Sequence, residues 1–369
     1  MKVLTDNDKI TVPQTVALII TTILGTGVLD LPRHVAKAAN SDGWILVLLG
    51  GIATFAVSFI IGSLVKEFPQ DTFIEYSQKT MGKLVAYPLS ILLILYFMSF
   101  TAITLRIFAE VTNIFLLPRT PREFIILSQM ALAFYLVRHG IEPLARLAEI
   151  LLPILIIPVF AMYFMAFPKA DFSELLPFMD TPLPKLMKGT FFTVYSYLGF
   201  EILLVVGPYM RSPDRVKWSL FASIGTVTLI YFFIVVMVFA TLGLENTKIL
   251  LWPTMSLVRT LTAPGGIFER LDAPALALWT IAAYTTNTSL FFAGALAIAH
   301  FFAFKEFKPF TTALFPWIYL MAIIPPNLLY VFEWANISGY FGIVICVVIP
   351  GFILLLSKIK RGRSRESNR

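Results

Sequence analysis

The fold is decided at Thr21-Thr22-Ile23-Leu24-Gly25-Thr26-Gly27-Val28-Leu29-Asp30-Leu31-Pro32, a stretch that interrupts the first long apolar run. Gly25 and Gly27 stand one residue apart in mid-run, and each glycine weakens a helix by about 1 kcal/mol. Pro32 follows shortly afterwards and suits the start of a new helix. The pattern therefore predicts a helix that unwinds at Gly25, Thr26 and Gly27 and then resumes.

A second interruption lies in the sixth apolar run, at Tyr195-Ser196-Tyr197-Leu198-Gly199-Phe200-Glu201. Gly207 and Pro208 close the far end of this run. A single interruption is also explained by small residues that let two membrane helices pack closely. Two interruptions at matched positions of two halves are typical of the central binding site of secondary transporters.

The composition places nearly the whole chain in a membrane. Of its 369 residues, 58% are hydrophobic and 14% are charged, whereas an ordinary soluble domain has about 25% charged residues. A membrane-spanning helix needs about 20 apolar residues. The apolar runs predict ten such helices, at about residues 11–39, 43–65, 84–117, 123–138, 142–167, 186–210, 217–243, 271–303, 309–330 and 336–357.

The ten helices divide into two repeats, at about 11–167 and 186–357. Because five is an odd number, the second repeat enters the membrane from the opposite side. We therefore predict an all-α integral membrane protein in one transmembrane domain, a 5+5 inverted repeat with helices 1 and 6 broken. Most Lys and Arg residues fall on the N-terminal side, which predicts cytoplasmic termini. The basic tail 358–369 is expected to be solvated and disordered near anionic headgroups.

Several classes of function are disfavoured. The charges, with a net value of +7, fall in short clusters, which argues against nucleic acid as a partner. Cys346 has no second cysteine to pair with, and the three histidines are too far apart for metal-ligand spacing. Neither a nucleophile–base pair nor a metal set is visible, so we expect no enzymatic activity, no cofactor and no metal.

The predicted breaks point to one kind of ligand. Unwinding at Gly25, Thr26 and Gly27 frees N–H groups at the positive end of a half-helix, and these groups suit a carboxylate. Carbonyls freed at the second break suit an ammonium group. A small zwitterion, meaning an amino acid, fits this pair. The predicted acceptors for the ammonium group are the carbonyls of Tyr195, Ser196 and Leu198.

Side chains near the breaks complete the predicted ligand site. Glu201, beside Gly199, carries a carboxyl group at membrane depth, which is costly and therefore indicates function as a proton carrier or as a latch on the loop. Aromatic residues of the third helix could wall the side-chain pocket, although such stripes are more often plain core. These residues are Tyr96, Phe97 and Phe100.

The other polar residues at membrane depth allow two interpretations. The eighth run contains Thr285-Thr286-Asn287-Thr288-Ser289. Thr285, Thr288 and Ser289 share one helical face and, with a freed carbonyl such as that of Leu24, make a candidate cation site. The alternative is that these hydroxyls bond within their own helix or to a neighbour. Arg106 and Glu110, four residues apart, predict a structural ion pair.

The break motifs Gly25-Thr26-Gly27 and Leu198-Gly199-Phe200-Glu201 resemble those of the amino acid–polyamine–organocation permease superfamily. The chain as a whole resembles the B-type permease subunit of bacterial spore germinant receptors. The segments that carry this resemblance are Ile10-Thr11-Val12-Pro13-Gln14, Asp42-Gly43-Trp44-Ile45, Phe68-Pro69-Gln70-Asp71-Thr72-Phe73-Ile74-Glu75-Tyr76 and Arg146-Leu147-Ala148-Glu149-Ile150-Leu151-Leu152-Pro153.

The resemblance implies a LeuT-like fold in the inner membrane of a spore, assembled with an A-type subunit and a C-type lipoprotein. It also implies sensing of a nutrient, commonly an amino acid, that triggers germination. By position, the backbone of Gly25, Thr26 and Gly27 would hold the carboxylate. One departure is that superfamily members coupled to protons can use a lysine in the fifth helix, whose apolar stretch here has Pro153 and Pro158 but no lysine.

Three hypotheses follow for the function. The leading one is a receptor subunit that binds a small nutrient at the unwound centres of helices 1 and 6 and signals germination. The alternative is a proton- or sodium-coupled amino-acid transporter. A third is a conducting pathway for ions or water.

Overall fold

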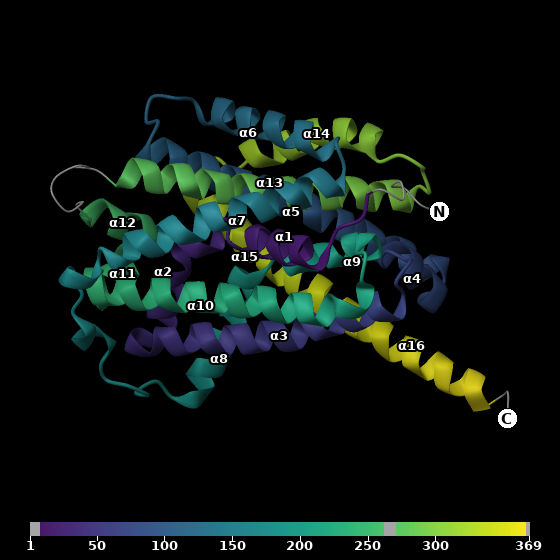
Figure 1. Ribbon diagram of the computed structural model, residues 1–369, viewed down its shortest axis with the longest axis horizontal. Helices are drawn as coiled ribbons and strands as arrows, with labels where there is room; N and C mark the ends of the chain where they lie inside the picture. The colour runs from purple at the N-terminus through teal and green to yellow at the C-terminus, as the bar shows by residue number, and fades with distance from the viewer. Residues whose placement is uncertain (1–7, 262–270, 367–369) are drawn as a thin grey trace.

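The computed structural model describes residues 8–261 and 271–366, without the side chains of Phe192, Asp272 and residues 361–366. Its long helices run roughly alongside one another, with α1 in the middle of the bundle (Figure 1). The short helix α4 (Phe73–Met81) lies at one end of the bundle, and α11 (Leu244–Ile249) and α12 (Pro253–Thr260) lie at the other.

The first apolar run forms two helices, as predicted. α1 (Val12–Ile23) begins at Thr11, which forms a capping box with Gln14. The helix ends before the glycines, and α2 (Gly27–Ala39) begins directly after them. Residues 24–26, the first break, belong to no helix. The unwound segment is therefore three residues long and lies one residue earlier than predicted, because Gly27 already begins α2.

The second interruption is also present. α8 (Leu183–Thr193) continues as the 3-10 turn η4 (Val194–Tyr197) and then stops. The chain resumes in the short elements η5 (Phe200–Ile202), α9 (Leu203–Val206) and η6 (Gly207–Tyr209), and the two parts are bent by 58°. Gly199 lies at the bend with φ +136°, a conformation that side chains rarely adopt. Residues 198–199 form the second break.

The other predicted runs each contain a long helix, and short turns connect them. The 3-10 turn η1 (Asn40–Asp42) links α2 to α3, and η2 (Phe167–Lys169), η3 (Phe172–Leu175) and η7 (Pro213–Arg215) are further connections. The remaining long helices up to the ninth run are α3 (Gly43–Glu67), α5 (Lys83–Phe115), α6 (Arg122–Val137), α7 (Ile141–Phe164), α10 (Val216–Leu242), α13 (Asp272–Phe301) and α14 (Lys308–Ile323).

The predicted boundaries of the last two runs are wrong. α14 ends at Ile323, and α15 (Leu328–Ile343) begins well before residue 336. Pro325 and Pro326 lie between them and cannot donate helical hydrogen bonds. Asn327 caps α15 by accepting hydrogen bonds from the next helix turn.

The C-terminal helix also differs from expectation. After α15 the chain passes through the π-helix η9 (Val344–Val348) into α16 (Ile349–Glu366). The backbone is thus helical up to Glu366, so the expectation of a disordered tail is wrong for residues 358–366. α16 projects beyond the bundle (Figure 1).

The chain is a multi-pass, helical membrane protein. Within the described residues, six helical stretches are long and apolar enough to cross a membrane, and the bent second interruption makes a seventh. α1 is a shorter apolar helix of 12 residues, and α6 and α14 have 16 residues each. The count of ten spans and the inverted repeat remain predictions.

Candidate functional site

The two breaks lie against each other inside the bundle. A Cβ added to Gly27 would lie 3.0 Å from the carbonyl oxygen of Ser196, and one added to Gly199 would lie 3.0 Å from the backbone nitrogen of Ile23. A Cβ on Gly25 would collide with the side chain of Thr286 on α13. Glycine is needed at Gly27 and Gly199 because the backbones of the two broken helices approach so closely, and at Gly25 because α13 packs against it.

At the first break, neighbouring helices supply donors for the carbonyls. The donors are neutral side chains on α10, α12 and α13, so the lost helical hydrogen bonds are replaced without a charge. The pairs are Tyr231 to Ile23 at 3.1 Å, Trp279 to Gly25 at 2.8 Å, Thr254 to Val28 at 2.8 Å, and Thr286 to Thr21 and Thr22 at 3.0 Å each.

The amides of the first break are left without partners. Neither the N–H of Gly25 nor that of Thr26 donates to an acceptor among the residues that the structure describes. They precede α2, a helix of 13 residues, whose N-terminus carries a partial positive charge. The first break therefore presents donors, as an anion-binding site requires.

At the second break, Glu201 takes the donors. Its Oε1 accepts a hydrogen bond from the Tyr96 hydroxyl at 2.7 Å, and its Oε2 accepts one from the Gly199 amide at 2.6 Å. Glu201 and Tyr96 are both completely buried. The carboxyl group thereby ties α5 to the unwound backbone, which is the geometry expected of a latch.

Two of the three carbonyls predicted to be free at the second break are already used. The Tyr195 carbonyl accepts from the Leu198 amide at 3.1 Å, because the chain tightens into a 3-10 turn there. The Ser196 carbonyl accepts from the Tyr231 hydroxyl at 3.0 Å. No donor to the Leu198 carbonyl is found in the described part of the chain. Each occupied carbonyl keeps a second lone pair.

The predicted aromatic wall divides between two places. The ring of Phe100 lies 5.6 Å from that of Tyr96 and 6.5 Å from that of Tyr195, so these three rings border the second break. Phe97 is completely buried and faces Gly294 of α13. Phe97 therefore belongs to the packing between α5 and α13.

An apolar cavity adjoins the first break, between α2, α7, α10, α12 and α13. Its wall includes Leu24, Val28, Tyr163 and Trp279. The cavity lies where the sequence gave no indication of a pocket, because its wall comes from five separate helices.

The residues of the candidate cation site bond mainly within α13. Thr288 donates to the Tyr284 carbonyl at 2.7 Å, and Ser289 donates to the Thr285 carbonyl at 2.8 Å. Thr285 donates to Ala282 at 2.8 Å, with only a long contact of 3.4 Å to Thr21. Thr286, which we did not predict, makes the main contact with α1.

The sequence did not predict a role at the breaks for three side chains that shape the site, namely Tyr231, Trp279 and Thr254. Each lies in an apolar or amphipathic stretch, and each acts through one polar atom on a distant backbone carbonyl. Only Thr286 had a signal, because it belongs to the polar run of the eighth helix. Thr286 was not included in the predicted cation site because it does not share the helical face of Thr285, Thr288 and Ser289.

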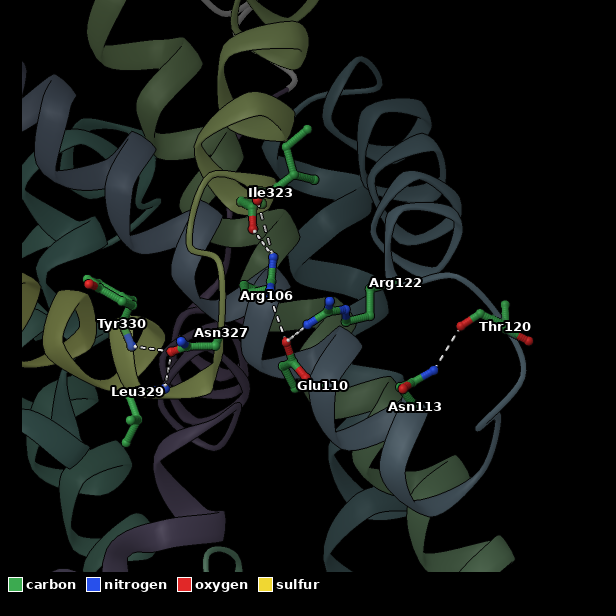
Figure 2. A network of polar contacts seen from close by, with 10 residues as sticks. Arg106, Glu110, Asn113, Thr120, Arg122, Ile323, Asn327, Leu329 and Tyr330 are labelled. Carbon is green, nitrogen blue, oxygen red and sulfur yellow. Dashed lines mark hydrogen bonds and ion pairs between the residues drawn. The ribbon is translucent and has the colours of Figure 1, made fainter.

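The predicted ion pair of Arg106 and Glu110 is present, at 2.9 Å, and it belongs to a network with further partners that was not predicted (Figure 2). Arg122 also contacts Glu110, at 2.7 Å. Arg106 donates to the carbonyls of Ala322 and Ile323 at the end of α14. The network ties α5 to the start of α6 and to the end of α14.

Comparison with known proteins places this arrangement in a family. A family model described as spore germination protein matches residues 9–331. The chain belongs to the spore germination protein family. Spore germination protein YndE of Bacillus subtilis (strain 168) is 31% identical over 356 residues, which cover 96% of this chain and 97% of that protein. Spore germination protein B2 of the same organism is 28% identical, with 96% of each chain covered.

Solved structures show which fold this spore germination protein has. MhsT in complex with L-phenylalanine matches with a TM-score of 0.69 at 16% identity, over 93% of this chain and 88% of that one. A Na+-coupled sialic acid symporter matches with a TM-score of 0.67 at 14% identity, over 95% and 79%. At these identities the likeness concerns the fold alone, and it confirms the LeuT-like prediction.

Proposed function

We propose that this chain is the membrane subunit of a spore germinant receptor and that it binds an amino acid between the two breaks. The proposal rests on one observation above all, the unpartnered amides of Gly25 and Thr26 beside the second break. Its setting is the spore inner membrane, with both termini in the cytoplasm. It acts as a receptor rather than as an enzyme.

The polar groups of the two breaks match the two charged ends of an amino acid. The carboxylate accepts hydrogen bonds from the amides of Gly25 and Thr26. The partial positive charge at the N-terminus of α2 also stabilises it. The ammonium group donates to the Leu198 carbonyl and to the spare lone pair of Ser196. The net charge of such a ligand is zero, so no arginine or lysine is required in the gap.

Binding is coupled to the rest of the bundle by two contacts. Tyr231 joins the Ser196 carbonyl to α10, and Glu201 joins the second break to α5. A ligand that competes for these groups favours one arrangement of the helices over another. In the proposed receptor, the A-type subunit and the C-type lipoprotein respond to this shift.

Binding is tested first on the purified full-length chain. We expect at least one of the standard amino acids to raise its melting temperature, because a ligand that binds only the folded chain stabilises it. Gly25→Leu should abolish the shift, because its side chain would collide with Thr286 and displace the unwound backbone that carries the two amides. Gly225→Leu is the matched control, since a Cβ added at Gly225 meets nothing within 4 Å. A shift retained by Gly25→Leu would contradict the proposed site.

Signalling is tested in spores that carry the complete receptor. Spores with Gly25→Leu or Glu201→Gln should fail to respond to the nutrient that stabilises the purified chain, whereas those with Gly225→Leu should respond. Normal germination of both site variants would contradict the receptor role. Counterflow of labelled amino acid in liposomes, driven by a sodium or pH gradient, would favour the transporter instead.

A further inference from the structure

We infer that Trp279 is a positioning residue that aims the Thr26 amide at the carboxylate of the ligand, an inference that rests on the proposed amino-acid site. Trp279 thereby sets the preference of the site for a carboxylate over a neutral carboxamide. The indole itself needs no contact with the ligand.

The indole of Trp279 is held firmly in place. It is 5% exposed, and its Nε1 donates to the Gly25 carbonyl at 2.8 Å. Its ring stacks on Phe108 of α5, with centroids 5.5 Å apart and an interplanar angle of 29°. Two helical turns further along α13, Thr286 holds the end of α1. The donor therefore has a fixed position relative to the break.

Fixing the Gly25 carbonyl also fixes the Thr26 amide. Both groups belong to one peptide unit, which is planar, and in a trans unit the C=O and N–H point in opposite directions. The one cis bond in the described residues is Leu176–Pro177. With its carbonyl directed at Trp279, the unit directs its N–H away from α13. Gly25 has no Cβ to resist rotation, so the bond to Trp279 holds the orientation.

The other carbonyl donors at this break do not aim a free amide. Thr254 holds the Val28 carbonyl, but the amide of that peptide unit, on Leu29, already donates to Thr26 at 3.1 Å. Tyr231 donates to the Ile23 carbonyl. The N–H of that peptide unit belongs to Leu24 and already donates to the Ile20 carbonyl at 3.0 Å. Of these three donors, Trp279 alone acts on a peptide whose N–H has no acceptor among the described residues.

The aimed amide favours a charged acceptor. A hydrogen bond to an ionised group is roughly twice as strong as one to a neutral group. A carboxylate therefore gains more from the oriented N–H than the carbonyl oxygen of a carboxamide does. Losing the orientation should lower the affinity for amino acids more than the affinity for their carboxamides.

The experiment compares Trp279→Phe with the wild type as full-length chains. Affinities are measured for each standard amino acid that stabilises the wild type and for the corresponding amino-acid carboxamide. We expect Trp279→Phe to weaken the amino acid about thirtyfold and the carboxamide about fivefold. Thr254→Val, which also removes a carbonyl donor, should leave the ratio of the two affinities within about twofold of the wild type.

The outcomes separate this inference from the function on which it rests. An unchanged ratio in a folded Trp279→Phe chain that still binds amino acids would overturn the role of Trp279 and leave the proposed site standing. If the wild type binds no amino acid, the proposed function fails and this inference with it. Where Trp279→Phe does not fold, benzothienylalanine at position 279 keeps the ring stacking and removes only the N–H, and the same change in ratio is expected.

Discussion

The two breaks differ in the backbone groups that they leave available. At the first break, neutral side chains of three other helices hold the carbonyls of Ile23, Gly25 and Val28, and the amides of Gly25 and Thr26 have no acceptor among the described residues. At the second break, the carboxyl group of Glu201 takes the Gly199 amide, and a carbonyl remains. The free amides of Gly25 and Thr26 therefore lie at the first break, whereas Glu201 occupies the Gly199 amide of the second break.

This difference indicates that the breaks do not act as copies of each other. Two equivalent breaks would each offer the same groups and would favour no orientation of a ligand. Opposite polarity across a narrow gap suits a molecule with an anionic and a cationic end. The polarity comes from residues outside the breaks, namely Trp279, Tyr231 and Glu201, rather than from the glycines themselves.

The largest expected effect comes from removing the carboxyl group at the second break. Glu201→Leu leaves the Tyr96 hydroxyl and the Gly199 amide buried without an acceptor, at a cost of about 4 kcal/mol in the free energy of unfolding. The melting temperature of the purified chain measures it. Tyr96→Phe removes one of the two donors and should cost clearly less. Equal melting temperatures for Glu201→Leu and the wild type would contradict the latch geometry.

A smaller effect is expected from the backbone of the second break. Gly199→Ala combines an unfavourable φ with a Cβ 3.0 Å from the backbone of α1, and should destabilise the chain by about 3 kcal/mol. Gly82→Ala is the matched control, because Gly82 has φ +80° but open space around it. It should cost about 1 kcal/mol. If the two variants lost the same stability, close approach of the breaks would not be the cause.

The sequence predicted the breaks and the polar groups that each should offer, but not the distant side chains that hold the other backbone groups. A break depends on the residues directly around it, namely an apolar run and its glycines. The breaks at Gly25, Gly27 and Gly199 could therefore be predicted from short stretches of sequence. Tyr231 and Trp279 act on the first break across 208 and 254 residues of chain, and one polar atom on an aromatic side chain leaves no periodic signal. Pro325 and Pro326 mark the true boundary between α14 and α15 in the sequence, but the apolar residues that follow them predict a later start for the last helix.

Tyr231 provides a test of the link between the breaks. Tyr231→Phe removes the hydroxyl that contacts both Ile23 and Ser196, and should cost about 1 kcal/mol of stability. It should also alter the affinity for amino acids, because the Ser196 carbonyl gains a free lone pair. Tyr197→Phe, whose hydroxyl donates to Val47, should cost similar stability and leave the affinity unchanged. Equal affinities in both variants would argue against the link.

The smallest effect concerns the end of the second broken helix. Tyr209 contacts His300 at 3.0 Å, and His300 lies 3.4 Å from Glu75. Burial alone would raise the pKa of Glu75, but the hydrogen bond and charge of His300 outweigh it and lower that pKa below 4.5. A carboxyl group whose pKa is lowered by folding stabilises the fold above its unfolded pKa, and loses this contribution as the pH falls through its folded pKa.

Glu75→Gln tests this contact, because glutamine preserves the capping box with Thr72 and removes only the charge. The variant should lose about 0.5 kcal/mol of stability at neutral pH. The difference from the wild type should shrink as the pH falls below 4.5. Chemical denaturation at several pH values measures it, and a difference that grows on acidification would contradict the assigned pairing.

A structure of the full-length chain with a bound amino acid tests the central claim most directly. We expect carboxylate oxygens about 2.7–3.1 Å from the backbone nitrogens of Gly25 and Thr26, with the ammonium group facing the carbonyls of Ser196 and Leu198. A carboxylate held instead by a side-chain cation, or an amino acid bound outside the gap between the breaks, would contradict it.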